Sequence, residues 1–169
     1  MTIETPTEYT YNTAHLTVLD STDLVFKVAT EDNALLALSV IPGVYDVMTY
    51  EIAIGETGNR LVQIRDGIGG AILAHAEKYG LLDRDELRSF WISWGSGRVS
   101  VGQGSTVGEE ELVSVMDVNL SFTTVAVSTD GWKGTWQFNI TTPDLGKAIW
   151  ILFRFSRTLH GLVTLNKAK

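Results

Sequence analysis

The chain contains no cysteine among its 169 residues. This absence excludes a disulfide framework and any metal site built from thiolates. Hydrophobic residues make up 44% of the chain, yet no apolar run approaches the roughly 20 residues that a helix needs to span a bilayer. Residues 1–7 contain neither a basic region nor an apolar segment, so they lack the features of a secretory signal. These features predict a cytoplasmic protein and leave secretion open.

Positive charge is also scarce. The 13 lysine and arginine residues are outnumbered by 20 aspartate and glutamate residues, which gives a formal net charge of −7. The basic residues are scattered along the chain, whereas surfaces that bind nucleic acid need them clustered. We therefore expect no nucleic-acid partner, and we attribute the acidity to ordinary solubility.

The length suits one domain that is large enough to bury a core. Residues 1–7 are predicted to be a disordered lead, and residues 8–169 are predicted to form a single β-sandwich domain. The sequence contains no repeat, low-complexity tract or interdomain linker.

The most informative stretch covers residues 90–104. It begins with the aromatic run Phe90-Trp91-Ile92-Ser93-Trp94, turns at Gly95-Ser96-Gly97, and continues with Val99 and Val101 alternating with polar residues. Alternation on both sides of a short glycine turn predicts a β-hairpin.

The same alternation recurs through most of the chain. Further strands are expected at residues 9–11, 16–19, 23–29, 34–40, 47–54, 61–65, 111–118, 122–128 and 134–141. About a dozen short strands separated by turns predict an all-β fold, an antiparallel β-sandwich of jelly-roll-like type with at most one short helix.

Two other segments are harder to assign. Residues 71–79 fit either a helix or a strand, and Asp83 and Glu86 have the spacing of a helix capping box. Residues 148–155 are apolar on both faces, which predicts a strand buried on two sides or a subunit interface. They belong to a predicted C-terminal strand extension, residues 139–166.

Several segments follow one another in a recognisable order. They are Tyr50-Glu51-Ile52-Ala53-Ile54-Gly55, Asn59, Ile64-Arg65, the strand that begins at Phe90, Gly97, Val101-Gly102-Gln103-Gly104, Val125-Ala126-Val127-Ser128-Thr129, and Gly131 with Gly134-Thr135-Trp136. In this order they resemble the domain family named after farnesoic acid O-methyltransferase, over about residues 9–138. The resemblance implies a non-catalytic β-sandwich module. Members of the family also occur beside modules implicated in carbohydrate recognition, which implies a sugar ligand.

The family name implies methyl transfer, but the residues do not favour it. A cofactor site of the usual kind needs alternating strands and helices with a glycine loop at the carboxyl end of a strand. The nearest candidate is Asp66-Gly67-Ile68-Gly69-Gly70, and Ile72 stands where the third glycine of such a loop belongs. We therefore expect no cofactor.

Metal-binding patterns are weak. His15, His75 and His160 lie far apart in the sequence and show no ligand spacing. The run Glu109-Glu110-Glu111 can offer oxygen ligands to calcium, but a solvated turn explains it better. We expect no metal site.

Catalytic patterns are equally weak. Ser96 lies in the tip of the predicted hairpin and lacks the surroundings of a nucleophile elbow. A carboxylate pair for glycoside hydrolysis can be assembled from Glu51, Asp66, Asp117 and Asp130, but any acidic sandwich offers such pairs. We expect no catalytic residue.

The tryptophans carry the strongest binding signal. Trp94 and Trp136 share strand faces with other apolar residues and are expected in the core, whereas Trp91 alternates with Trp94 and points to the opposite face. Trp132 instead lies in the polar turn Asp130-Gly131-Trp132-Lys133, where burial is harder to arrange. An exposed indole can stack on the C–H face of a sugar while neighbouring polar groups bind its hydroxyls.

The predicted ligand-binding residues are Asp130 and Trp132, together with Asn59 and Arg60 of the loop Gly58-Asn59-Arg60. The alternative for Asn59 is a turn residue that tolerates a left-handed backbone conformation.

We expect a non-enzymatic, lectin-like module that binds carbohydrate through loop residues and gains multivalency by homo-oligomerisation. One alternative is an enzyme, either a methyltransferase as the family name suggests or a glycoside hydrolase. The other is a protein–protein interaction domain.

Overall fold

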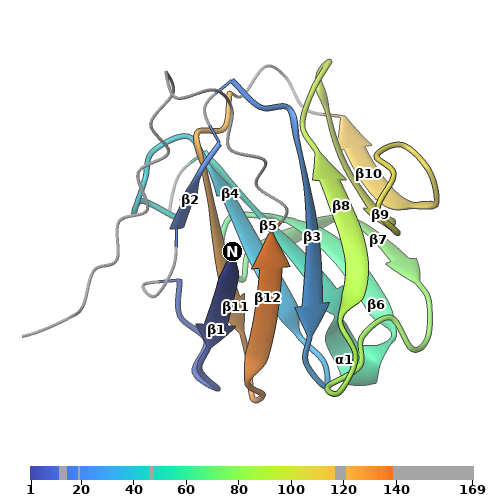
Figure 1. Cartoon of the computed structure of the whole chain (residues 1–169). Helices are drawn as coiled ribbons and strands as arrows, with labels where there is room; N and C mark the ends of the chain where they lie inside the picture. Colours follow the sequence, from blue (N-terminus) through green and yellow to red (C-terminus); the bar gives the residue numbers. More distant parts are fainter. Residues whose placement is uncertain (12–14, 19, 46–47, 117–120, 139–169) are drawn as a thin grey trace, which may run out of the picture.

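The computed structural model describes residues 1–11, 15–18, 20–45, 48–116 and 121–138. These residues form two six-stranded antiparallel sheets that pack face to face (Figure 1). The strands are β1 (Thr2–Thr5), β2 (His15–Thr17), β3 (Asp23–Ala29), β4 (Ala34–Ser39), β5 (Thr49–Gly55), β6 (Leu61–Asp66), β7 (Ala71–Glu77), β8 (Arg88–Ser93), β9 (Arg98–Gln103), β10 (Glu111–Met116), β11 (Thr124–Thr129) and β12 (Gly134–Phe138), and one short helix, α1 (Glu56–Asn59), follows β5.

The strand order defines two sheets. Sheet A has the order β1-β12-β3-β8-β9-β10, and sheet B has the order β2-β11-β4-β5-β6-β7. Strands β4 to β7 form successive hairpins in sheet B, and strands β8 to β10 do the same in sheet A. The predicted all-β antiparallel sandwich with one short helix is confirmed.

Alternation of side chains builds the core between the sheets. In β12, Trp136 and Phe138 are buried, while Thr135 and Gln137, which alternate with them, are only partly covered. The same period in both sheets places one apolar face of each against the other, and burial of these faces is the main favourable contribution to folding.

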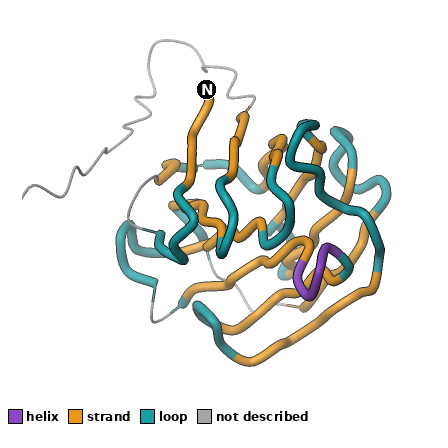
Figure 2. The backbone as a smooth tube through the Cα atoms, turned by 90° about the horizontal axis from the view of Figure 1, so that it is seen from below, coloured by secondary structure: helices purple, strands orange, loops and turns teal. Residues whose placement is uncertain are grey.

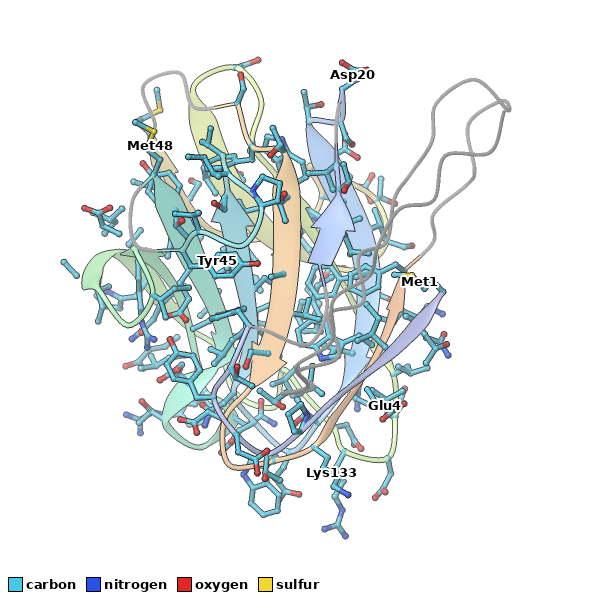
Figure 3. The ribbon with its side chains drawn as sticks, turned by 90° about the vertical axis from the view of Figure 1, so that its left-hand side faces the viewer. Met1, Glu4, Asp20, Tyr45, Met48 and Lys133 are labelled. Atoms are coloured by element: carbon cyan, nitrogen blue, oxygen red, sulfur yellow. The ribbon has the colours of Figure 1, made fainter. Side chains whose placement is uncertain are left out.

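The outer face of sheet B is covered as well. Strands β4 and β11 are buried along their whole length, which alternation alone does not explain. Residues 6–11, here called the strap, run beside β11, where the Thr10 amide donates to Ser128 Oγ at 3.0 Å. The side chains of Tyr11 and Tyr45 pack with Leu35 on this outer face, and Figure 3 shows Tyr45 lying over the strands.

The predicted hairpin of residues 90–104 is confirmed as β8 and β9, with Phe90 opposite Gln103. Trp94 and Trp136 are buried, as expected. Trp91 points to the opposite face of β8, yet it is only 1% exposed because its indole lies against Gly102 and donates to the Glu109 carbonyl at 2.7 Å.

The prediction that residues 1–7 form a disordered lead is wrong. Thr2–Thr5 form β1, which pairs with β12 through the register Thr2 to Gln137 and Thr5 to Gly134. This partner lies more than a hundred residues away in the sequence, so the first residues carry no local signal for it.

The structure also settles the two ambiguous segments near the middle of the chain. Ala71–Glu77 form β7, not a helix. Asp83 Oδ1 accepts hydrogen bonds from the amides of Asp85 and Glu86 at 2.8 and 3.1 Å, in a bend without a helix. These bonds lower the pKa of the Asp83 carboxyl. Residues 9–11, expected as a strand, belong to the strap.

The predicted C-terminal strand extension, residues 139–166, and the apolar residues 148–155 lie outside the described residues. Among the described residues, no helix has the length and apolar character to cross a membrane.

Several connections between strands gather at one end of the sandwich. Figure 2 views this end, where α1 lies among turns, and Figure 3 shows Lys133 there, with Asp20 and Met48 at the opposite end. This end contains the residues that the sequence analysis selected for ligand binding.

Candidate functional site

Three connections meet at this end of the sandwich: the β3–β4 turn, the start of α1, and the β11–β12 turn. Asn33 joins them. Its backbone amide donates to the Gly55 carbonyl at 3.4 Å, and its side-chain Nδ2 donates to the Asp130 carbonyl at 3.3 Å. The β3–β4 turn therefore holds the other two connections side by side.

The β11–β12 turn projects Trp132 into solvent. Gly131 has φ of +80°, a left-handed conformation that favours glycine, and its amide donates to the Thr7 carbonyl at 2.8 Å. The following side chain, Trp132, is 44% exposed, and Asp130 is exposed beside it. The predicted exposure of Trp132 is confirmed.

Asp32 adds a carboxylate that the sequence analysis did not select. Burial, followed by the negative charges of Glu31, Glu56 and Asp130, raises the pKa of the Asp32 carboxyl above its ordinary value. Its Oδ1 is shielded from solvent and accepts no hydrogen bond from any described residue. Asp32 therefore has a buried acceptor without a described partner, at the same end as Trp132.

Asn59, a predicted ligand-binding residue, has both polar atoms of its side chain paired within the protein. Its φ of +58° places it in the left-handed region, the alternative that the sequence left open. Its Nδ2 donates to the Leu82 carbonyl at 2.7 Å, and its Oδ1 accepts from the Leu82 amide at 2.9 Å. The side chain of Asn59 is thus used to fasten α1 to the segment before β8.

Arg60 also faces this segment. Its guanidinium carbon lies 5.9 Å from the ring centroid of Tyr79, within cation–π range. Asn59 and Arg60 therefore lie at the same end as Asp130 and Trp132, but the structure shows their side chains in contact with residues 79–82.

A second polar cluster lies on the outer face of sheet B and centres on Glu51, which has no solvent exposure. Its Oε1 accepts hydrogen bonds from the hydroxyls of Tyr9 and Tyr11, the latter at 2.7 Å. Its Oε2 accepts from Arg65 Nη1 and from the Gly69 amide, both at 2.9 Å. Both oxygens are saturated, so this carboxylate has no capacity left for a ligand or a proton transfer.

This arrangement shifts the pKa values of the two strap tyrosines. Burial and the adjacent Glu51 carboxylate raise the pKa of both Tyr9 and Tyr11 well above the ordinary value. Both hydroxyls stay protonated and act as donors, so the cluster fastens the strap to sheet B. The sequence signal for it was a charged residue, Glu51, in the middle of an otherwise apolar strand.

Of the four carboxylates considered for glycoside hydrolysis, the three that lie in the described ranges have different surroundings. Glu51 is buried and saturated, Asp66 is exposed at the end of β6, and Asp130 is exposed in the β11–β12 turn. Asp117 lies outside the described residues. Within the described ranges, no group of three or more histidine, aspartate or glutamate residues is arranged to hold a metal ion.

The glycine run after Asp66 serves a hairpin. It connects the antiparallel strands β6 and β7 and donates the Gly69 amide to Glu51. A Cβ atom at Gly70 would lie 1.9 Å from the Asp66 carbonyl oxygen, so the tight turn itself requires this glycine. The run is followed by a strand, whereas a nucleotide-type cofactor loop leads into a helix.

Comparison with solved structures places the fold. A Bacillus subtilis protein of unknown function with a galectin-like fold aligns over 75% of this chain and 72% of its own, with 8% identity and a TM-score of 0.51. The exoplasmic/lumenal domain of VIP36, in a form bound to Ca²⁺ and Man3GlcNAc, aligns over 83% of this chain and 80% of its own, with 12% identity and a TM-score of 0.49. The alignment with the Bacillus subtilis protein shows that the β-sandwich has a galectin-like fold.

Comparison with known sequences gives the family. No curated protein matches this chain. The model of the family described as farnesoic acid O-methyl transferase matches residues 5–143, which is most of the chain. The resemblance noted in the sequence is confirmed, and the chain belongs to the farnesoic acid O-methyltransferase domain family.

Proposed function

We propose that this domain binds carbohydrate without transforming it, at the end of the sandwich formed by the β3–β4 and β11–β12 turns. The observation that carries the proposal is the half-exposed indole of Trp132 beside the exposed Asp130 carboxylate. An indole in this position can cover the C–H face of a sugar ring, and a carboxylate can accept hydrogen bonds from its hydroxyls.

Asp32 extends the proposed site. Its Oδ1 is a buried acceptor without a partner among the described residues, and leaving such a group unpaired costs free energy until a donor reaches it. A sugar hydroxyl supplies that donor without adding charge. Asn33 acts as a positioning residue, because it holds the Asp130 turn against the β3–β4 turn.

Binding without turnover is the function that the side chains favour. Glu51, the fully buried carboxylate, accepts hydrogen bonds from four donors and has no capacity left for proton transfer. The glycine run after Asp66 closes a hairpin and does not form a cofactor loop. We further propose that the domain is a homo-oligomer, since several copies of a weak sugar site gain avidity when they are linked.

A glycan array probed with the full chain tests the function. Binding to a defined set of glycans is expected, followed by calorimetry with the best ligand. Trp132→Ala should weaken this affinity by about tenfold, because an aromatic contact contributes about 0.5–1.5 kcal/mol beyond its buried area. The control is Met116→Ala, whose side chain is 79% exposed on β10 and which should bind like the wild type.

Two results would contradict the proposal. If no glycan on the array is bound, the domain does not have the proposed function. If Trp132→Ala binds with wild-type affinity, the binding site is not at Trp132.

The family name supports a second candidate, methyl transfer. Calorimetry with S-adenosylmethionine tests it directly, and tight binding of this cofactor would favour the enzyme over the binding module.

A further inference from the structure

The edge of sheet B at β7 has an unusual composition. β7 is the last strand in the order of sheet B, and within the described ranges no strand pairs with its outer edge. Edge strands are commonly protected by lysine or proline, because their unpaired backbone groups can pair with another chain. Ala71–Glu77 contain neither residue, and Ile72 and Leu73 are 53% and 44% exposed.

A bulge limits the part of this edge that is regular. The register with β6 shifts between Ile64, opposite Ala74, and Arg65, opposite Ile72, which leaves Leu73 as the extra residue. Bulges distort an edge locally and hinder pairing there. The usable edge therefore begins at Ala74 and continues through the exposed Lys78 toward Tyr79, which is 71% exposed.

The hydrogen-bonding pattern identifies which backbone groups face outward. The Lys78 amide donates to the Arg60 carbonyl at 2.9 Å, so the Lys78 backbone points toward β6, as residues do in the hydrogen-bonded pairs of a ladder. Such pairs alternate along an antiparallel ladder. Ala76 and Ala74 therefore point their backbone groups toward β6, while the backbone groups of His75 and Glu77 point away from the sheet.

These outward groups fit a second copy of the same strand. If two β7 strands pair antiparallel about an axis through Ala76, His75 of each copy lies opposite Glu77 of the other, and the two exchange backbone hydrogen bonds. Both side chains are exposed and share one face of the sheet, since residues two apart do so. The imidazole of His75 has an N–H that can donate to the Glu77 carboxylate placed directly across the two strands.

Other registers lack this match. An axis through His75 would place the two His75 side chains opposite each other, and an axis through Ala74 would place Leu73 opposite His75. The axis through Ala76 also brings the exposed Leu73 of one copy toward the exposed Tyr79 of the other. Side-chain hydrogen bonding and apolar exposure therefore select the same register.

We propose that the β7 edge is a self-association surface, at which two copies pair antiparallel with Ala76 of one copy opposite Ala76 of the other. The proposal does not depend on carbohydrate binding. It names a surface within the described residues and places no role on residues 139–169.

Cysteine cross-linking tests the register, because the chain has no cysteine of its own. Ala76→Cys places two thiols at a non-hydrogen-bonded pair, where Cα atoms lie about 4.5 Å apart, within the range of a disulfide. In the same register, two Ala74→Cys thiols would be separated by four residues, roughly 13 Å along the strands. Mild oxidation should therefore give dimers with Ala76→Cys and only background with Ala74→Cys and with the exposed Lys133→Cys.

Light scattering after size exclusion tests the association itself. The mass should rise with concentration from 18.6 kDa toward twice that value. Glu77→Lys should weaken association about fivefold, because it removes the carboxylate that accepts from His75 in both symmetry-related pairs. The double variant His75→Glu with Glu77→Lys restores an opposite-charge pair and should recover dimerisation.

Three results would overturn the proposal: a monomer at every concentration, equal cross-linking of Ala74→Cys and Ala76→Cys, or no recovery in the double variant. Circular dichroism confirms that each variant is folded, which is expected because the charge changes are on exposed positions. A dimer that forms without cross-linking at Ala76 would assign association to another surface.

Discussion

The guanidinium of Arg65 lies 2.9 Å from the carboxylate of Glu51, a side chain with no solvent exposure. The two residues are directly opposite each other on the neighbouring strands β5 and β6. Arg65 is itself only 15% exposed and also pairs with Glu56 at 3.1 Å. A charge pair of this kind sits on the face of a sheet that would ordinarily be solvated, and the strap covers it.

Arg65→Ala should destabilise the protein strongly. It leaves the buried Glu51 carboxylate without its cation, and breaking a buried pair in this way costs about 3–5 kcal/mol. Urea unfolding followed by tryptophan fluorescence measures the loss. Arg84→Ala is the matched control, because Arg84 pairs with Glu31 at 3.6 Å with both side chains exposed, and such pairs contribute about 0–1 kcal/mol. Equal losses in the two variants would contradict the assigned role of Arg65.

Stability should fall as the pH rises above about 10, the ordinary pKa of tyrosine. Burial raises the pKa of Tyr45 to about 12, and burial with Glu51 raises the pKa of Tyr11. Below the unfolded pKa both states hold the phenolic proton, and the stabilisation is fully present. Above it the unfolded state loses the proton first, so the free energy of unfolding decreases until the folded pKa is reached.

The measurement is the urea midpoint between pH 8 and pH 11. Tyr11→Phe should show a smaller decrease over this range than the wild type, because it removes one of the groups that titrate differently in the two states. If the urea midpoint falls equally with pH in both proteins, Tyr11 does not contribute to the loss of stability at high pH.

Gly102→Ala should disturb the packing of Trp91. A Cβ at Gly102 would lie 2.2 Å from indole ring atoms, so the ring or the strand must shift. Overpacking of this kind costs about 1–3 kcal/mol. The control is Gly95→Ala, where the nearest atom to an added Cβ is Thr22 Cβ at 3.4 Å and a small effect is expected. Chemical denaturation compares the two, and a neutral Gly102→Ala would mean that β8 and β9 adapt freely.

Asn59→Ala separates a structural role from a ligand-binding role. The variant loses both side-chain hydrogen bonds to Leu82 and should cost about 1–3 kcal/mol of stability, while the affinity for a glycan stays within twofold of the wild type. Thermal unfolding measures the stability, and calorimetry on the same sample measures the glycan affinity. A large loss of glycan affinity in a stably folded Asn59→Ala protein would show that Asn59 is a ligand-binding residue.

The polar and apolar order of the residues determined much of the fold. Alternation in residues 90–104 predicts the β8–β9 hairpin because side chains on a strand alternate between the core and the outside. The polar neighbours of Trp132 predict its exposure because a turn with Asp130 and Lys133 has no apolar face to bury. These features depend on neighbours in the chain, so the sequence by itself is sufficient for them.

Only the tertiary structure decided which distant segments meet. Thr2–Thr5 become a strand because β12 offers them a partner, and backbone pairing of this kind leaves little trace in four residues of sequence. The buried acceptor of Asp32 joins the Trp132 turn because Asn33 reaches Asp130 across 97 residues. Contacts at such separations are set by the order of strands in the sheets, which local periodicity does not specify.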